Sequence, residues 1–157
     1  EAVIVDTRHN GGGWLHDALA TLLDGTTYIR FEPRGQYIGT EPYNKWTKPS
    51  CVLIGEDNYS DACGFPYVYK TLGIGKLIGA PVPGTMTAVW WENQIDPSIV
   101  FGIPQVGALG VKEGRYLENM QIEPDILVYN DPASVLRGED KQLEAAVKEM
   151  LKTIESR

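Results

Sequence analysis

The sequence predicts a single α/β domain. Short apolar runs with the length of buried strands alternate along the chain with segments whose apolar residues recur at helical spacing. Glycine, proline and polar residues separate these segments, as they do at the ends of strands and helices. The chain has 157 residues, which is enough for one domain with a sizeable core. Its 43% hydrophobic and 22% charged residues are ordinary for a globular protein.

The N-terminal part predicts a strand, a helix, a second strand and an irregular excursion. Residues 2–6 form an apolar run typical of a buried strand, and residues 14–23 have the apolar spacing of a helix. Residues 26–31 are rich in β-branched and aromatic side chains, which favours a strand. Several prolines and glycines interrupt residues 32–49. We expect an irregular excursion there, either a hairpin or an arm that contacts a partner.

The middle of the chain predicts a strand, a sharp turn and a helix. Residues 51–55 form a short buried strand, and the polar turn 56–61 leads into a helix over 62–72. A further short strand is expected over 76–78, and a proline- and glycine-rich loop over 79–84.

The next part predicts short strands and turns. Strands are expected over 87–91, 99–104 and 107–111, and a last strand over 126–129 follows the loop 118–125.

The C-terminal segment 138–157 is expected to carry an amphipathic helix over 138–154, with Glu139 and Asp140 near its start. The chain opens on a core strand, without an initiator methionine or a signal peptide. We therefore expect residues 1–157 to be one subdomain of a longer, multidomain protein. The expected apolar face of the helix comprises Leu143, Val147, Met150, Leu151 and Ile154.

The composition argues against several classes of protein. The 14 basic and 21 acidic side chains give a net charge of −7, and no basic run or stripe indicates a nucleic-acid partner. No apolar run approaches the roughly 20 residues that span a bilayer, so no transmembrane helix is expected. Cys51 and Cys63 form no CxxC motif or Cys/His cluster that indicates a metal site, and we expect both to be core residues without a disulfide.

A run of three glycines, Gly11, Gly12 and Gly13, lies between the first strand and the first helix. Glycines allow a backbone to approach a ligand closely, and free N–H groups at such a turn attract an anion or a developing oxyanion. No Lys-Ser/Thr pair follows, so the run is not a phosphate-binding P-loop. A tight strand-to-helix turn without any function is the alternative interpretation.

Ser60 occupies a second strand-to-helix turn. A serine at this position can cap the helix, or it can act as a nucleophile at the positive end of the helix, beside the Asp61 N–H. If the glycine turn and the serine turn lie at adjacent strand ends, together they form an oxyanion hole and a nucleophile.

Five motifs in one order resemble the catalytic domain of the tricorn-type and C-terminal-processing serine peptidases. The resemblance covers residues 2 to about 151, and it implies an α/β spiral of the crotonase and Clp-protease kind. The sequence departs from the family pattern at Gln121, where the family usually has glycine. The motifs are DTRHNGGG (6–13), NYSDA (58–62), LGIGKLIG (72–79), LENMQIEPD (117–125) and GEDKQL (138–143).

The resemblance implies Ser60 as the nucleophile and the N–H groups of Gly13 and Asp61 as the oxyanion hole, with Gly12 adjacent. The bacterial processing type takes its base from a lysine 25 residues after the serine, but that position holds Thr85. The tricorn type uses a histidine from an upstream segment, oriented through a second serine and a glutamate.

Glu118 matches the glutamate of the tricorn type. The upstream histidine lies outside this sequence. Of the two histidines present, His16 is expected to be a surface or core residue of the first helix. His9, in the glycine loop, is a weak alternative base. Trp90 and Trp91 are expected to pack in the core or an interface rather than line a substrate cleft.

The sequence thus predicts the catalytic subdomain of a serine peptidase that acts on peptides or unfolded polypeptides through an acyl-enzyme. No metal or organic cofactor is expected. The sequence is compatible with a homo-oligomer, and it does not indicate a cellular compartment. The isolated chain is expected to be nearly inactive without the upstream base. The alternatives are a carrier of the same fold that binds a ligand without catalysis, and a crotonase-like acyl-CoA enzyme.

Overall fold

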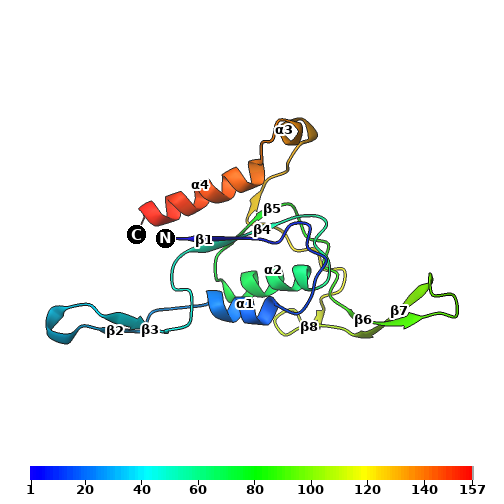
Figure 1. Cartoon of the computed structure of the whole chain (residues 1–157), viewed down its shortest axis with the longest axis horizontal. Coiled ribbons are helices and arrows are strands. Elements are labelled where there is room, and N and C mark those ends of the chain that lie inside the picture. Colours follow the sequence, from blue (N-terminus) through cyan, green and yellow to red (C-terminus); the bar gives the residue numbers. More distant parts are fainter. Residues whose placement is uncertain (157) are drawn as a thin grey trace.

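The centre of the computed structural model, which describes residues 1–156, is a parallel sheet (Figure 1). Its four strands are arranged in the order β1-β4-β5-β10. The register pairs Ile4 with Cys51 and Cys51 with Lys76, so β4 lies between β1 and β5. The strands are β1 (Val3–Asp6), β4 (Ser50–Ile54), β5 (Lys76–Gly79) and β10 (Ile126–Leu127).

Helices cover both faces of this sheet. Helices α1 (His16–Leu23) and α2 (Asp61–Leu72) pack against each other on one face, and α4 (Lys141–Glu155) lies on the other (Figure 1). The short helix α3 (Pro132–Leu136), which the sequence pattern did not predict, precedes α4. The arrangement confirms the predicted α/β class.

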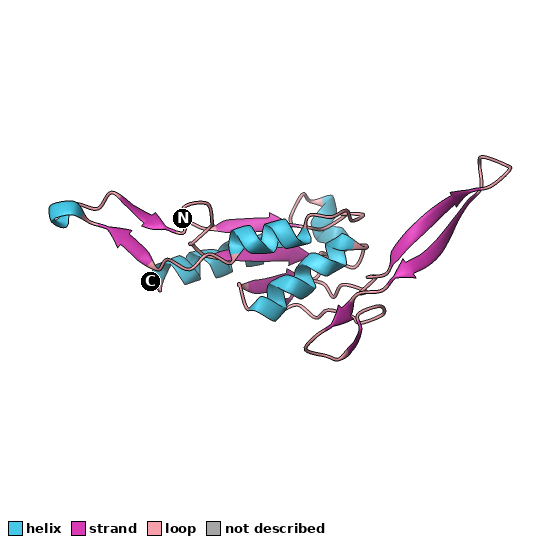
Figure 2. Cartoon of the chain, turned by 90° about the horizontal axis from the view of Figure 1, so that it is seen from below, coloured by secondary structure: helices cyan, strands magenta, loops and turns pink. Residues whose placement is uncertain are grey.

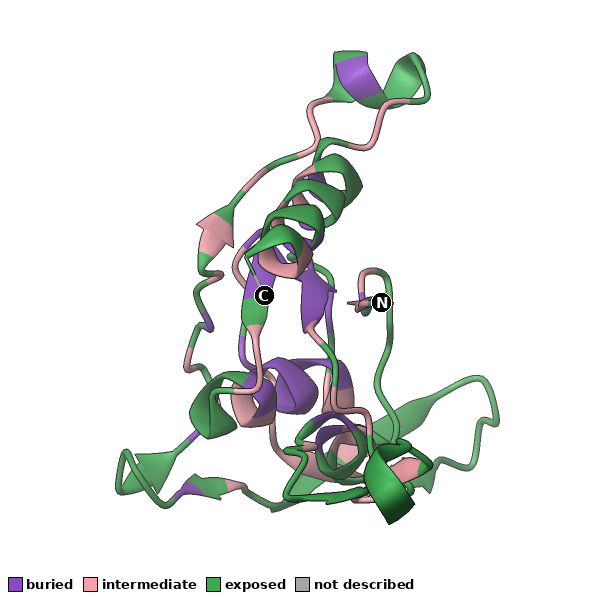
Figure 3. Ribbon diagram, turned by 90° about the vertical axis from the view of Figure 1, so that its left-hand side faces the viewer, coloured by how far each residue is buried: buried purple, intermediate pink, exposed green. Residues whose placement is uncertain are grey.

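The central strand β4 explains why its sequence is apolar without alternation. Val52 and Ile54 join the core cluster toward α1 and α2, whereas Cys51 and Leu53 join the cluster toward α4. A parallel strand that is covered on both faces has apolar residues at successive positions, because side chains on both faces are buried. In Figure 3 the buried residues are concentrated in this sheet and in the helix surfaces that face it.

The two cysteines are free and buried, as expected. Because they belong to the clusters on opposite faces of the sheet, they cannot pair without rearrangement of the core. Burial, with a smaller contribution from Glu149, raises the pKa of the Cys51 thiol to about 11, so both thiols behave as small apolar side chains.

Two antiparallel hairpins extend from opposite ends of the sheet (Figures 1 and 2). One hairpin consists of β2 (Ile29–Phe31), the 3₁₀ turn η1 (Pro33–Gly35) and β3 (Gly39–Glu41), and the other of β6 (Ala88–Asn93) and β7 (Val100–Val106). Trp90 and Trp91 on β6 are 56% and 62% exposed, so they do not pack in the core of residues 1–156, and the alternative, packing in an interface, stays a prediction.

A short ladder follows the second hairpin. Strand β8 (Leu109–Gly110) pairs with β9 (Arg115–Tyr116), a strand that the sequence pattern missed because it is only two residues long. The chain then crosses back to the sheet, where Val82 and Ile122 form an isolated bridge.

Helix α4 is rotated relative to the expected apolar face. Of the expected face, Met150 is buried and Ile154 is half-buried, but Leu143, Val147 and Leu151 are 41–54% exposed, and Ala146, which was not expected there, is buried instead. The small side chain of Ala146 allows close approach to the sheet, and the buried Gln142 lies one turn before it. The helix begins at residue 141 rather than 138, because Asp140 accepts a hydrogen bond from the Leu143 N–H at 3.0 Å and caps it.

Hydrogen bonds from Arg8 link the end of β1 to the start of α4. Its guanidinium donates to Asp6 at 2.7 Å, to Asp140 at 2.8 Å and to Gln142 at 3.0 Å. The Arg8 guanidinium holds the pKa of the Asp140 carboxyl well below its usual range, and the same partner lowers the pKa of Asp6. This contact explains why Gln142 faces inward.

Candidate active site

The glycine loop and the serine turn lie at the same edge of the sheet. The loop follows β1 and the turn follows β4, and these two strands are parallel neighbours, so their carboxyl ends meet. The Tyr59 N–H donates to the Asn10 carbonyl at 3.1 Å, which joins the two segments directly.

Ser60 stands at the start of α2 in an unusual backbone conformation, with φ 54° and ψ −120°. A positive φ is costly for a residue with a Cβ atom, and such strain is frequent at functional sites. The Ser60 hydroxyl does not cap the helix. Ser60 thus occupies the N-cap position without making a capping hydrogen bond, and the capping interpretation of this serine is wrong.

Buried Asn58 holds the serine turn in this shape. Its amide nitrogen donates to the Thr7 hydroxyl and to the Ala62 carbonyl, each at 2.9 Å, and its oxygen accepts from the Gly55 N–H at 3.3 Å. Thr7 in turn donates to the Leu53 carbonyl at 2.7 Å. The network connects the residues after β1 to both sides of the turn that carries the serine.

Gly12 packs directly against the serine turn. A Cβ atom on Gly12 would lie 2.7 Å from the Ser60 Cβ and 2.9 Å from the Tyr59 carbonyl oxygen, and φ is 103°. Only glycine fits here. The Gly12 N–H donates to Asn10 Oδ1 at 2.7 Å, so it is already satisfied.

The N–H groups of Gly13 and Asp61 are free within the described part of the chain: neither donates a hydrogen bond to another of these residues. Both residues line a cleft of about 520 Å³ together with Ser60. Unpaired N–H groups beside a hydroxyl are the donors that an oxyanion hole requires.

The Asp61 side chain has a separate role. Its carboxylate accepts from the N–H groups of Leu15 at 2.8 Å and His16 at 3.2 Å, and it contacts the His16 ring at Nδ1. Asp61 thereby caps α1 from the first turn of α2. His16 was expected to be an ordinary surface or core residue, but it is half-buried in the wall of the cleft.

The His9 side chain lies outside the cleft that contains Ser60. Its ring is bonded to Asp57 through Nδ1, and the side chain is 83% exposed. No lysine stands among the described cleft residues either, and Thr85 occupies the position of the dyad lysine.

Glu118 does not line the cleft itself but binds the backbone of two residues that do. Its Oε2 accepts from the N–H groups of Met86 at 2.8 Å and Thr87 at 2.7 Å, two residues that line the cleft. Burial raises the pKa of this carboxyl, but the hydrogen bonds from Met86 and Thr87 outweigh burial and leave the pKa below its ordinary value. Glu118 is therefore an ionised group that fixes the segment 86–87.

Comparison with known proteins assigns the chain to a family. The model of peptidase family S41 matches residues 1–128, which is most of the chain. The chain belongs to peptidase family S41.

Relatives of this S41 domain support the assignment. The tricorn protease of Thermoplasma acidophilum is 25% identical over 154 residues, and a tricorn protease homolog of Saccharolobus solfataricus is also 25% identical over 154 residues. Each match covers 98% of this chain but 14% of the relative. The chain thus spans about a seventh of the length of these relatives.

Solved structures show the same fold. The crystal structure of the tricorn protease superposes with a TM-score of 0.83 and 26% identity over 98% of this chain and 15% of that chain. The photosystem II D1 C-terminal processing protease superposes with a TM-score of 0.52 and 16% identity over 82% of this chain and 34% of that chain. The expected tricorn-type and processing-peptidase family and its α/β fold are confirmed, and the S41 domain is a serine-peptidase domain.

Sequence reasoning missed three residues of this site. Asn58 was part of a motif, but its burial and its bonds to Thr7 depend on contacts between residues about 50 positions apart. His16 gave no signal because helical spacing does not show which residue on another helix it meets. Trp91, on strand β6 of the β6–β7 hairpin, lines the cleft, contrary to expectation.

Proposed function

We propose that this S41 domain hydrolyses peptide bonds of peptides or unfolded polypeptides through an acyl-enzyme on Ser60, with a general-base histidine supplied from outside this chain. The observation that carries the proposal is the cleft that the strained Ser60 lines together with two N–H groups that have no partner among residues 1–156. A carrier of the same fold has no need for a strained serine at this place.

The chemistry follows from these groups. The Ser60 oxygen attacks the peptide carbonyl carbon as the histidine takes the hydroxyl proton, and the N–H groups of Gly13 and Asp61 stabilise the oxyanion. The C–N bond then breaks, and the histidine returns the proton to the departing amine. A water molecule, deprotonated by the same base, hydrolyses the ester and frees Ser60.

Glu118 fits the supporting role that the family resemblance implies. Its Oε2 is occupied by Met86 and Thr87, whereas its Oε1 accepts no hydrogen bond from the described residues. We infer that Oε1 accepts a hydrogen bond from the upstream serine that orients the histidine. The lowered pKa keeps the acceptor ionised at neutral pH.

Replacement of Ser60 tests the proposal. In the full-length parent, Ser60→Ala is expected to lower kcat for an unstructured peptide by several orders of magnitude, because the nucleophile is lost. Ser98→Ala, on an exposed part of the β6–β7 hairpin, is the matched control and is expected to leave kcat unchanged. Residual activity of Ser60→Ala within about tenfold of the parent would remove Ser60 from the mechanism.

Two further measurements complete the test. A fluorophosphonate is expected to label Ser60 in the parent, whereas a carrier of this fold would remain unlabelled. The isolated 157-residue chain is expected to hydrolyse the same peptide far more slowly than the parent. Equal rates would place the base inside this chain.

A further inference from the structure

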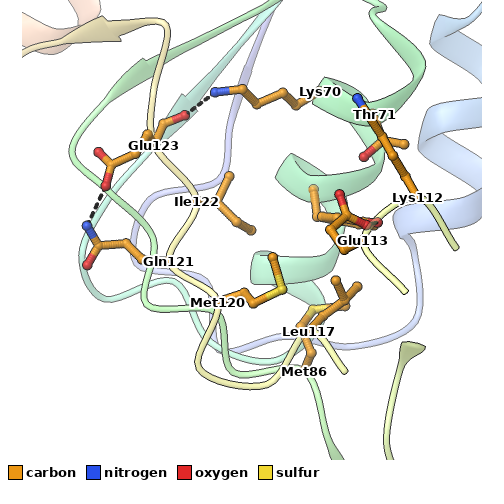
Figure 4. A pocket seen from close by; sticks show the side chains of 11 residues that line it. Lys70, Thr71, Met86, Lys112, Glu113, Leu117, Met120, Gln121, Ile122 and Glu123 are labelled. Atoms are coloured by element: carbon orange, nitrogen blue, oxygen red, sulfur yellow. Dashed lines mark hydrogen bonds between the residues drawn. The ribbon is translucent and has the colours of Figure 1, made fainter. Parts of the chain in front are cut away.

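A second cavity lies next to the cleft that contains Ser60. It has a volume of about 320 Å³ and lies between α2 and the segment that follows β9 (Figure 4). Its walls are mainly apolar, with Leu117 and Ile122 almost fully buried. Among the described residues, Met86 is the only one that lines both this cavity and the cleft.

The Met86 backbone is fixed, whereas its side chain is free to adapt. Glu118 accepts from the Met86 N–H at 2.8 Å, which holds the main chain in place. The thioether lies over Gly64: a Cβ atom added there would meet the Met86 Cε at 3.3 Å and Sδ at 3.5 Å. Gly64 lines the same cleft as Ser60, so the methionine lies against the part of α2 that borders the nucleophile.

The polar groups around the second cavity are largely paired with one another. The Tyr67 hydroxyl donates to Glu113 at 2.5 Å, and Lys70 donates to the Glu123 carbonyl at 2.6 Å. The Gln121 amide donates to the Glu123 carboxylate at 2.6 Å. In Figure 4, Met86 lies beside Leu117 at the end of the cavity away from Lys70. The space behind Met86 is therefore suited to an apolar chain rather than to a charged one.

We propose that Met86 is a specificity-determining residue: its side chain closes the floor of the Ser60 cleft and limits the length of the substrate side chain that fits there. The side chain concerned belongs to the residue whose carbonyl Ser60 attacks. This inference rests on the proposed function, and it adds the substrate preference. With Met86 present, short apolar side chains fit. With Met86 shortened, the cleft joins the second cavity and accepts a long, unbranched apolar side chain.

The test compares two peptide substrates that differ only at this residue, alanine in one and norleucine in the other. The full-length parent is expected to cleave the alanine substrate at least as well as the norleucine substrate. Met86→Ala is expected to raise the ratio of kcat/KM for norleucine over alanine by about tenfold or more, since each methylene in an apolar pocket changes discrimination by that order. Met86→Leu, which preserves the volume, is expected to keep the parent ratio.

Met120→Ala is the matched control. Met120 lines the second cavity but not the cleft, so its truncation enlarges the cavity without opening it toward Ser60. The ratio is expected to stay within about twofold of the parent value, a small change for a pocket contact. If Met120→Ala raises the ratio as much as Met86→Ala does, Met86 does not separate the two spaces and the inference is wrong.

A binding measurement removes the dependence on catalysis. Product peptides that end in alanine or norleucine are titrated by calorimetry into the parent and into Met86→Ala, and the norleucine product is expected to gain about tenfold in affinity in the variant. Met86→Val replaces Met86→Ala if the latter does not fold. If Met86→Ala still binds or hydrolyses peptides but keeps the parent's preference between alanine and norleucine, the inference about Met86 is wrong and the proposed function stands. Absence of both binding and hydrolysis in the parent overturns the proposed function.

Discussion

Replacement of Asn58 by alanine tests the network that shapes the serine turn. Asn58 is 1% exposed, and its side chain makes hydrogen bonds with Thr7, Ala62 and Gly55. Each buried hydrogen bond contributes about 1 kcal/mol net, and truncation also leaves buried partners without a bond. We therefore expect Asn58→Ala to lower the free energy of unfolding by about 3 kcal/mol.

Urea unfolding followed by circular dichroism measures this loss. With an m-value of about 2 kcal/mol per molar, the expected change moves the midpoint by about 1.5 M. Asn93→Ala, at the exposed end of β6, is the control and should change the free energy by no more than about 0.5 kcal/mol. A loss below about 1 kcal/mol for Asn58→Ala at an unchanged m-value would show that the network does not hold the turn.

Two further predictions concern Gly12 and Glu118. Gly12→Ala is expected to cost about 2 kcal/mol of stability and at least tenfold in kcat, because its Cβ meets the Ser60 Cβ at 2.7 Å. Gly11→Ala, whose Cβ has nothing within 4 Å, is the stability control and should change the free energy of unfolding by no more than about 0.5 kcal/mol. The lowered pKa of Glu118 adds stability that is fully present above its ordinary value of 4.5 and is lost as pH falls through the lowered value. Glu118→Gln should flatten the stability profile in that acidic range, and an unchanged profile in urea titrations at several pH values would contradict this.

The sequence located the candidate site residues and the two turns that hold them. Apolar runs located β1, β4 and β5, and helical spacing located α1, α2 and α4, because both patterns depend only on neighbours along the chain. The glycine run and Ser60 were recognisable for the same reason: each is a local motif between a strand and a helix.

The tertiary structure decided which of these residues meet. Gly12 touches Ser60, Asp61 caps α1, and Glu118 binds the backbone at Met86, and each contact joins residues 31 or more positions apart in the sequence. The face that α4 buries was also decided at this level. Sequence periodicity identifies an apolar stripe but not its partner. The close approach of Ala146 to the sheet and the bonds from Arg8 to Asp140 and Gln142 turn Leu143 and its neighbours outward.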